Sequence, residues 1–180
     1  MIPLPTLAPS LEAVTVALDA ATEEQQINWM HGLGKREMAR LYELGGPVPL
    51  DHFVADDGVI VEHEGQNSLL PGFDRFEKHI VRRGAVLQGY NKQGFGWLVG
   101  PGHFTLREQD GTTVFDYTAP PADAPSEWPG VVPNDKGLSN LVYGGMVDVM
   151  HRVSSRIVVG KAYRRGKEEG AYFLLFRRSA

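Results

Sequence analysis

Apolar residues in the first quarter of the chain recur at the spacing of a helix. Ser10 is a favourable N-cap for a first helix and Thr22 for a second, and a third is expected over 35–44. The run Gly45-Gly46-Pro47 then gives a strong stop signal. The pattern predicts a helical N-terminal segment over residues 1–46.

From residue 47 onward the pattern changes to short runs rich in β-branched and aromatic residues, separated by turn residues. The dipeptide Asp110-Gly111 favours a tight hairpin. Because most connections are turns, the strands should pair antiparallel. Strands are expected over residues 58–64, 85–90, 96–99, 103–108, 112–118, 156–164 and 170–178.

Two further helices are expected in this second part. Over 73–83, Phe76 and Ile80 lie on one side of a helix, and Lys78 lies on the other side with arginines as a solvated face. A helix over 138–153 precedes the final hairpin. Between them, the proline-rich residues 119–137 form a long loop that is functional or mobile.

The order of these elements indicates the fold class. Helices gather at the start and before the last hairpin, and they do not alternate with strands. We therefore predict an α+β protein with a mainly antiparallel, strongly curved sheet or small β-barrel. Its 180 residues form one domain, with a helical segment over 1–46 and a barrel-like body over 47–180.

Composition excludes several classes of function. The chain has no cysteine, which rules out disulfides, thiolate metal sites and a cysteine nucleophile. Its 22 acidic residues outnumber 18 basic ones, so nucleic acid is not expected as a partner. The start lacks the pattern of a signal peptide and no stretch suits a membrane helix, which predicts a cytoplasmic protein without membrane insertion.

A run of motifs in the last third carries a family resemblance. Val147-Asp148, Arg152-Val153-Ser154, Val158-Val159-Gly160, Gly166-Lys167 and the aromatic-rich 172–175 occur in that order. This run resembles the C-terminal end of small bacterial lipocalin-like domains of the GXWXG type. The resemblance covers about a fifth of the chain. It implies a calycin-like barrel with an interior pocket and supplies no catalytic residues or cofactor.

The strand over 58–64 offers the first candidate for chemistry. Strand alternation places Val59, Val61 and His63 on one face. If that face looks inward, His63 could orient a ligand carbonyl or act as a general base, because its charge changes near neutral pH. Alternatively, it is a structural histidine bonded to a backbone carbonyl.

Asp116 is the second candidate. Beside Val114 it could be an inward carboxylate whose pKa is raised by burial, and with His63 or His103 it could form an acid-base site. It could equally be a solvated hairpin residue. The six histidines are scattered without a metal-ligand spacing, so neither a metal nor a cofactor is expected.

Three functions follow as hypotheses. The preferred one is binding of a small hydrophobic molecule inside the barrel, with the proline-rich loop over its mouth. The candidate lining comprises His63, Tyr90, Trp97, Asp116, Tyr117 and Trp128. The second is an enzyme in the same cavity, of isomerase, cyclase or hydrolase type, acting on a polyketide-like or steroid-like substrate. The third is self-association, for example as a homodimer, through Trp29, Met30, Met38, Leu41 and Tyr42.

Overall fold

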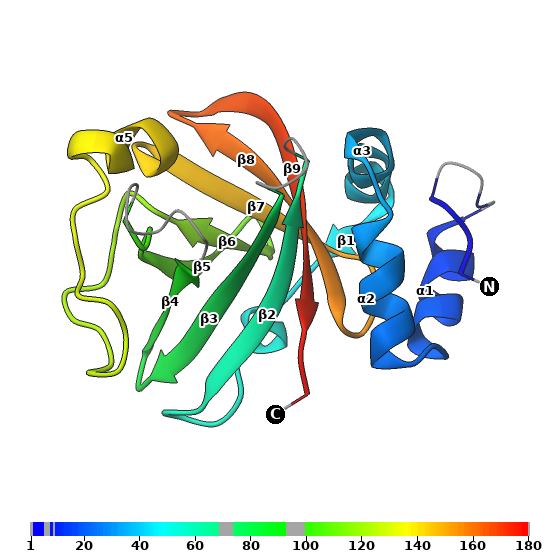
Figure 1. The fold of residues 1–180 in the computed structure, drawn as a ribbon, viewed down its shortest axis with the longest axis horizontal. Coiled ribbons are helices and arrows are strands. Elements are labelled where there is room, and N and C mark those ends of the chain that lie inside the picture. Colours follow the sequence, from blue (N-terminus) through cyan, green and yellow to red (C-terminus); the bar gives the residue numbers. More distant parts are fainter. Residues whose placement is uncertain (1, 6–7, 9, 69–73, 93–99, 180) are drawn as a thin grey trace.

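The chain forms a β-barrel with three helices packed on one side, as the ribbon of the computed structural model in Figure 1 shows. The structure describes residues 2–5, 8, 10–68, 74–92 and 100–179. The predicted α+β class is confirmed. Within the described residues no helix is long and apolar enough to cross a membrane.

Eight antiparallel strands close the barrel. They hydrogen-bond in the order β7-β6-β5-β4-β3-β2-β9-β8, and pairing between β7 and β8 closes the ring. The short β1, Gly46–Pro47, adds to β7. Closure leaves few open edges, and an eight-stranded barrel encloses a space that side chains nearly fill. The strands are β2 Ile60–Asn67, β3 Arg75–Arg83, β4 Val86–Lys92, β5 Phe104–Gln109, β6 Thr112–Asp116, β7 Met146–Arg152, β8 Ile157–Arg164 and β9 Lys167–Arg177.

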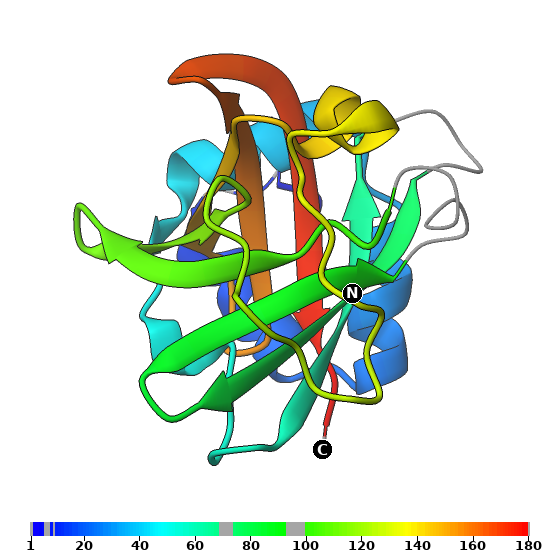
Figure 2. The same cartoon turned by 90° about the vertical axis from the view of Figure 1, so that its left-hand side faces the viewer.

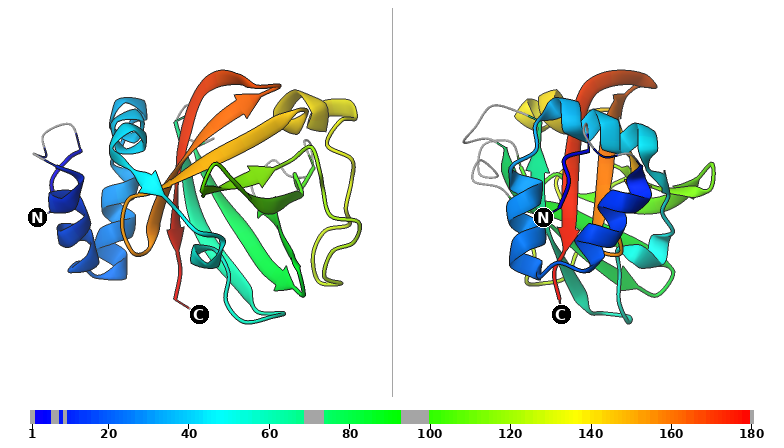
Figure 3. Two further views of the ribbon diagram at one scale, coloured as in Figure 1. Left: turned by 180° about the vertical axis from the view of Figure 1, so that it is seen from behind. Right: turned by 90° about the vertical axis from the view of Figure 1, so that its right-hand side faces the viewer.

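The predicted N-terminal helices are present. They are α1 (Leu11–Asp19), α2 (Glu23–His31) and α3 (Lys35–Leu44), and the side chains of Ser10 and Thr22 cap the first two. Figure 3 shows them on the outer face of the barrel, where their apolar residues pack against β8 and β9.

This packing uses the residues that the self-association hypothesis had assigned to an interface. Met30, Met38 and Leu41 are fully buried, while Trp29 and Tyr42 pack against the same cluster. The chain's own barrel therefore covers Met30, Met38 and Leu41, whereas Trp29 and Tyr42 stay partly exposed.

The helix predicted over 73–83 is wrong, because Arg75–Arg83 is the strand β3. Phe76 and Ile80 are four residues apart, a spacing that suits one face of a helix and also one face of a strand. The segment forms a strand because it hydrogen-bonds with β2 on one side and with β4 on the other. Lys78 therefore lies on the inner face with Phe76 and Ile80, not on a solvated face.

The helix predicted over 138–153 is also wrong in its second half. Helix α5 spans Gly137–Tyr143 only, and β7 follows after a turn in which Gly145 has a φ of +69°. Met146, Asp148 and Met150 then alternate toward the barrel interior.

The other local predictions hold, apart from the strand expected over 96–99, which lies outside the described residues. Asp110 and Gly111, with φ values of 51° and 79°, join β5 to β6. Arg165 and Gly166 join β8 to β9 in the same way. Residues 119–136 contain no helix or strand.

The two ends of the barrel differ. Figures 1 and 2 show α5 over one end, near the start of β7. The short helix η1 (Leu50–His52) lies toward the other end, where Phe53 inserts into the core against Phe115. The apolar core fills the barrel between them.

Candidate functional site

A cavity of about 170 Å³ lies inside the barrel at the end covered by α5. Apolar side chains from α5, β3, β7, β8 and β9 form most of its wall. Val142 and Met146 are partly exposed, so the cavity reaches the surface beside α5. Among its polar lining residues, Lys78, Asn91, Tyr117 and Asp148 form one buried cluster.

Lys78 is the centre of this polar cluster. It is only 2% exposed, and its Nζ donates hydrogen bonds to Asn91 Oδ1 at 2.6 Å and to the Tyr117 hydroxyl at 2.5 Å. Asn91 Nδ2 donates to the Gly102 carbonyl at 3.2 Å. Because a carbonyl can only accept, this bond fixes the amide so that its oxygen faces Lys78.

Five aromatic rings surround the Lys78 amine, and we call them the aromatic cage. Their centroids lie between 4.7 and 5.4 Å from Nζ, within the range of cation–π attraction. The cage consists of Phe76, Phe104, Phe115, Tyr117 and Phe173.

Three cage rings lie over glycines on the neighbouring strand. A Cβ added at each glycine would stand 2.2–2.6 Å from the ring, closer than carbon atoms can approach. Each pair is also directly opposite in the strand register, so the missing side chain leaves the space that the ring occupies. The pairs are Phe76 with Gly65, Phe104 with Gly89 and Phe173 with Gly160.

Asp148 supplies the opposite charge. It is 2% exposed, and burial raises its pKa to about 6, although the nearby Lys78 charge and a hydrogen bond with Tyr117 act against this rise. Its Oδ1 is buried and has no hydrogen-bond partner among the described residues. A buried acceptor without a donor is costly, so this oxygen marks a place where a ligand or water donor fits.

The same burial acts on Lys78 in the opposite direction. It lowers the pKa of the Lys78 amine to about 8, against the attraction of Asp148. The Tyr117 hydroxyl is in contact with both groups, and burial raises its own pKa. Two groups of one cavity therefore change charge near neutral pH.

His63 points into the barrel, which is the condition that its candidate role required, and it lies opposite Lys78 in the β2–β3 register. It is 1% exposed, packs near Phe53 and does not border the cavity. Burial, with the charges of His52 and Arg177, lowers its pKa to about 3. His63 is neutral at pH 7 and takes up a proton poorly, which disfavours the role of general base.

The expectation of an inward Asp116 with a raised pKa is wrong. Asp116 lies on the outer face of β6, on the opposite side from Phe115 and Tyr117. Burial tends to raise its pKa, but hydrogen bonds from Thr118 and Arg107 outweigh burial and the pKa is lowered.

Tyr90 and Trp128 meet on the outer face of the barrel. Their ring centroids are 4.8 Å apart, and they pack with Val81 in a separate small cluster. Together they border a surface groove of about 600 Å³. Tyr90 therefore does not face the interior as predicted, and Trp97 lies outside the described residues.

Of the six side chains predicted as lining, Tyr117 alone among the described ones borders the interior cavity. The prediction missed Lys78, Asn91 and Asp148. If residues 75–83 are interpreted as a strand, alternation places Lys78 on the same face as Phe76 and Ile80, and this signal could have identified it.

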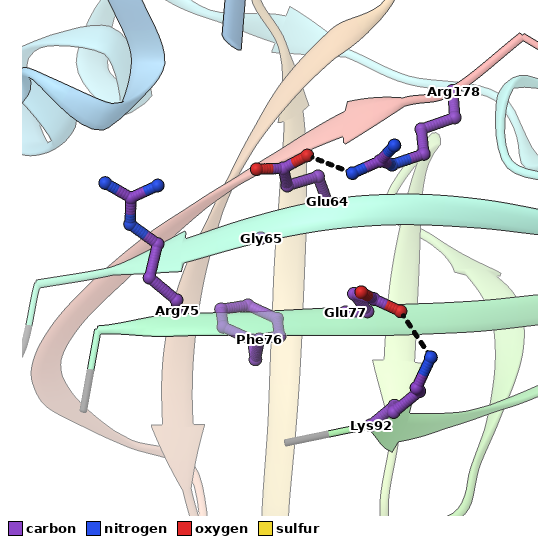
Figure 4. A pocket seen from close by; sticks show the side chains of 7 residues that line it. All are labelled: Glu64, Gly65, Arg75, Phe76, Glu77, Lys92 and Arg178. Carbon is purple, nitrogen blue, oxygen red and sulfur yellow. Dashed lines mark hydrogen bonds and ion pairs between the residues drawn. The ribbon is translucent and has the colours of Figure 1, made fainter. Parts of the chain in front are cut away.

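A second hollow of about 420 Å³ lies on the outer face of β2 and β3, seen in Figure 4. There Glu64 points to Arg178 and Glu77 to Lys92, with ion-pair distances of 2.5 and 3.1 Å. These carboxylates are thus matched within the chain, and partly exposed pairs of this kind contribute little. The interior cavity, with its unmatched buried oxygen, is the better candidate site.

No group of three histidine, aspartate or glutamate side chains in the described part of the chain is arranged to hold a metal ion. The polar cluster of the cavity combines one amine with one carboxylate, a set suited to hydrogen bonding and proton transfer. No family model, curated protein or solved structure matches this chain.

Proposed function

We propose that the protein binds a small, mainly apolar molecule in the barrel cavity, with the polar end of the ligand at Lys78 and Asp148. The observation that carries this proposal is the unpartnered, buried Oδ1 of Asp148, next to a cavity that also holds the Lys78 amine. A ligand with a hydroxyl or N–H group would supply the missing donor.

The energetics of buried charge support a binding role. A lysine and a carboxylate inside an apolar barrel lose hydration, and replacing such a pair by packed apolar residues is often neutral or stabilising. The pair is therefore not explained by stability. Recognition of a polar group inside an apolar cavity explains it, because a few placed polar side chains fix ligand orientation.

Cavity size limits the ligand. Sites for drug-sized molecules are commonly ~300–1,000 Å³, whereas a cavity of roughly 150 Å³ holds a benzene-sized molecule. At about 170 Å³ the interior cavity suits one ring or a short chain. The steroid-like or polyketide-like substrate of the enzyme hypothesis is larger than this space.

The resemblance of a run of motifs, about a fifth of the chain, to small bacterial lipocalin-like domains supports the same proposal, because such barrels hold ligands inside. An enzyme of acid-base type in this cavity is the second candidate. It is favoured by the pKa values of about 8 for Lys78 and about 6 for Asp148, which suit proton transfer at neutral pH.

The test is a binding screen with single-ring and short-chain compounds that carry a hydroxyl, amide, carboxylate or carbonyl group. Native mass spectrometry and thermal shift would be run on the wild type and on Ala162→Leu, which fills the cavity opposite Asp148. Lys78→Met removes the amine, and Lys92→Met, on the outer face, is the matched control.

We expect at least one compound to bind the wild type and Lys92→Met, with binding lost in Ala162→Leu and weakened in Lys78→Met. Equal binding by Ala162→Leu would place the ligand elsewhere and overturn the proposal. Failure of every compound class to bind the wild type would do the same.

A further inference from the structure

The geometry around Lys78 points to a covalent use of its amine: we propose that Lys78 forms a reversible imine with a small aldehyde held in the barrel cavity. This inference rests on the proposed function and names the ligand class as carbonyl compounds of about the size of benzaldehyde. It is carried by the position of the amine, its hydrogen-bond partners and the proton donors beside it.

The first observation is the place of the amine. Lys78 Nζ borders the cavity while the residue is 2% exposed, so a bound aldehyde meets the amine away from bulk water. An imine is hydrolysed by water, and the apolar walls around the buried amine disfavour water at the C=N bond, which favours the imine over the free aldehyde. The aromatic cage offers apolar walls for the rest of the ligand and attraction for a protonated imine.

The second observation is the number of acceptors at Nζ. Among the residues that the structure describes, two side-chain oxygens accept from it, Asn91 Oδ1 at 2.6 Å and the Tyr117 hydroxyl at 2.5 Å. A neutral amine has two N–H groups, and these two acceptors satisfy both. The lone pair of the neutral amine then stays free to attack a carbonyl carbon.

Burial increases the fraction of Lys78 whose amine is neutral. With a pKa of about 8, roughly a tenth of Lys78 is neutral at pH 7. An ordinary exposed lysine with a pKa near ~10.4 is neutral in only about 0.04% of molecules at that pH. The pKa of Lys92 and that of Lys161 are raised, so their amines are neutral even less often and react more slowly.

The third observation is a proton donor and acceptor next to the amine. Tyr117 accepts from Lys78 and also hydrogen-bonds with Asp148, so the hydroxyl connects the amine with the carboxyl group. Asp148, with a pKa raised to about 6, can give and take a proton near neutral pH.

The reaction balances with these groups alone. The Nζ lone pair forms a bond to the carbonyl carbon, the C=O π electrons move to oxygen, and oxygen takes a proton from the Tyr117–Asp148 pair. The nitrogen then returns a proton to that pair, which gives the neutral carbinolamine. The pair gives a second proton to the oxygen, the nitrogen lone pair forms the C=N bond as the C–O bond breaks, and water leaves. The iminium nitrogen returns its remaining proton to the pair, so amine plus aldehyde gives imine plus water, without an oxidant or reductant.

The experiment is reductive trapping with benzaldehyde and sodium cyanoborohydride at pH 7, followed by peptide mapping. Among the lysines, we expect one benzyl group per chain, on Lys78, formed at least tenfold faster than on Lys35, Lys92, Lys136, Lys161 or Lys167. Lys78→Met should lose this fast addition and Lys92→Met should keep it. Asp148→Asn should slow the addition at Lys78 without moving it to another lysine.

Benzyl alcohol, which has the same ring but no carbonyl, separates this inference from the proposed function. Added to the wild type, it should compete with trapping at Lys78 and leave the other lysines unaffected, a result that needs no variant to fold. If benzyl alcohol binds in the cavity but benzaldehyde labels lysines in proportion to their exposure, the imine is wrong and the binding site stands. If neither compound reaches Lys78, both are wrong.

Discussion

The ring of Phe173 on β9 lies directly over Gly160 on β8, its partner in the strand register. A Cβ at Gly160 would stand 2.2 Å from the ring. The same ring is one wall of the aromatic cage, 5.3 Å from the Lys78 amine. Gly160 on β8 thus leaves room for the Phe173 ring on β9, and that ring covers the buried amine of Lys78 on β3.

This relationship predicts that Gly160→Ala destabilises the protein. The added methyl group forces the Phe173 ring out of its position, and overpacking of this kind costs about 1–3 kcal/mol. Chemical denaturation of both proteins measures the difference in unfolding free energy. Adding Phe173→Leu to Gly160→Ala should recover part of the loss, because a smaller side chain leaves room for the methyl group.

Gly46→Ala is the matched control for this test. A Cβ at Gly46 meets no atom within 4 Å, so its unfolding free energy should change by less than about 0.5 kcal/mol. If Gly160→Ala is as harmless as Gly46→Ala, the tight contact between ring and backbone does not exist.

Lys78 and Asp148 should be coupled in stability. Lys78→Met leaves a buried carboxylate without its cation, and Asp148→Asn leaves a buried amine without its anion. Each single variant should lose stability at pH 7, while the double variant should be more stable than the sum of the two effects predicts, by about 1–3 kcal/mol. A double-mutant cycle by urea denaturation gives this coupling energy; strictly additive effects would contradict it.

His63 should make the protein sensitive to acid. Its folded pKa of about 3 lies below the ordinary value of 6.5, so the unfolded chain takes up a proton first as pH falls below 6.5. Above pH 6.5 the neutral His63 does not lower the free energy of unfolding. Between pH 6.5 and pH 3 that free energy falls as the pH falls, by about 3 kcal/mol at pH 4 for this one group. Urea denaturation of His63→Gln and of the wild type over this pH range should show that the unfolding free energy of the variant depends less on pH.

Asp148 changes the unfolding free energy with pH in the opposite direction from His63, so its effect must be removed from that comparison. Its raised pKa means that the folded protein takes up a proton first as pH falls through 6, which increases stability. The His63→Gln comparison is therefore repeated in Asp148→Asn. An unchanged pH dependence after His63→Gln in both backgrounds would show that His63 is not a buried neutral group.

Arg164 should keep α5 over the cavity. Its guanidinium donates to the carbonyls of Gly144 at 2.8 Å and Val142 at 3.1 Å, at the C-terminal end of α5. Arg164→Gln should therefore increase amide hydrogen exchange over 137–143 and speed ligand association. Lys167→Gln, in the hairpin next to Arg164, is the control, and equal exchange in both variants would argue against this role.

Local signals in the sequence predict much of the fold. The caps at Ser10 and Thr22, the stop at Gly45-Gly46-Pro47 and the turn at Asp110-Gly111 act within a few residues, so they do not depend on the rest of the chain. The barrel follows from the number of strands between turns.

The candidate site was harder to predict because it depends on contacts between distant strands. Lys78 has the appearance of a surface residue, and its burial follows from pairing with β2 and β4 and from ring positions on three other strands. Asp148 was assigned to a helix, since the residues on both sides of Gly145 share an apolar pattern that fits either period. A single sequence does not contain these long-range pairings.

An NMR titration of the lysine Cε carbons in the wild type, with and without benzyl alcohol, tests the buried amine and its cavity most directly. We predict that one of the six lysines titrates near pH 8, that its signal is missing in Lys78→Met, and that it shifts when benzyl alcohol is added while the Lys92 signal does not. If all six lysines titrate near ~10.4 and none responds to benzyl alcohol, Lys78 is neither buried nor part of a binding site, and the proposed function is wrong.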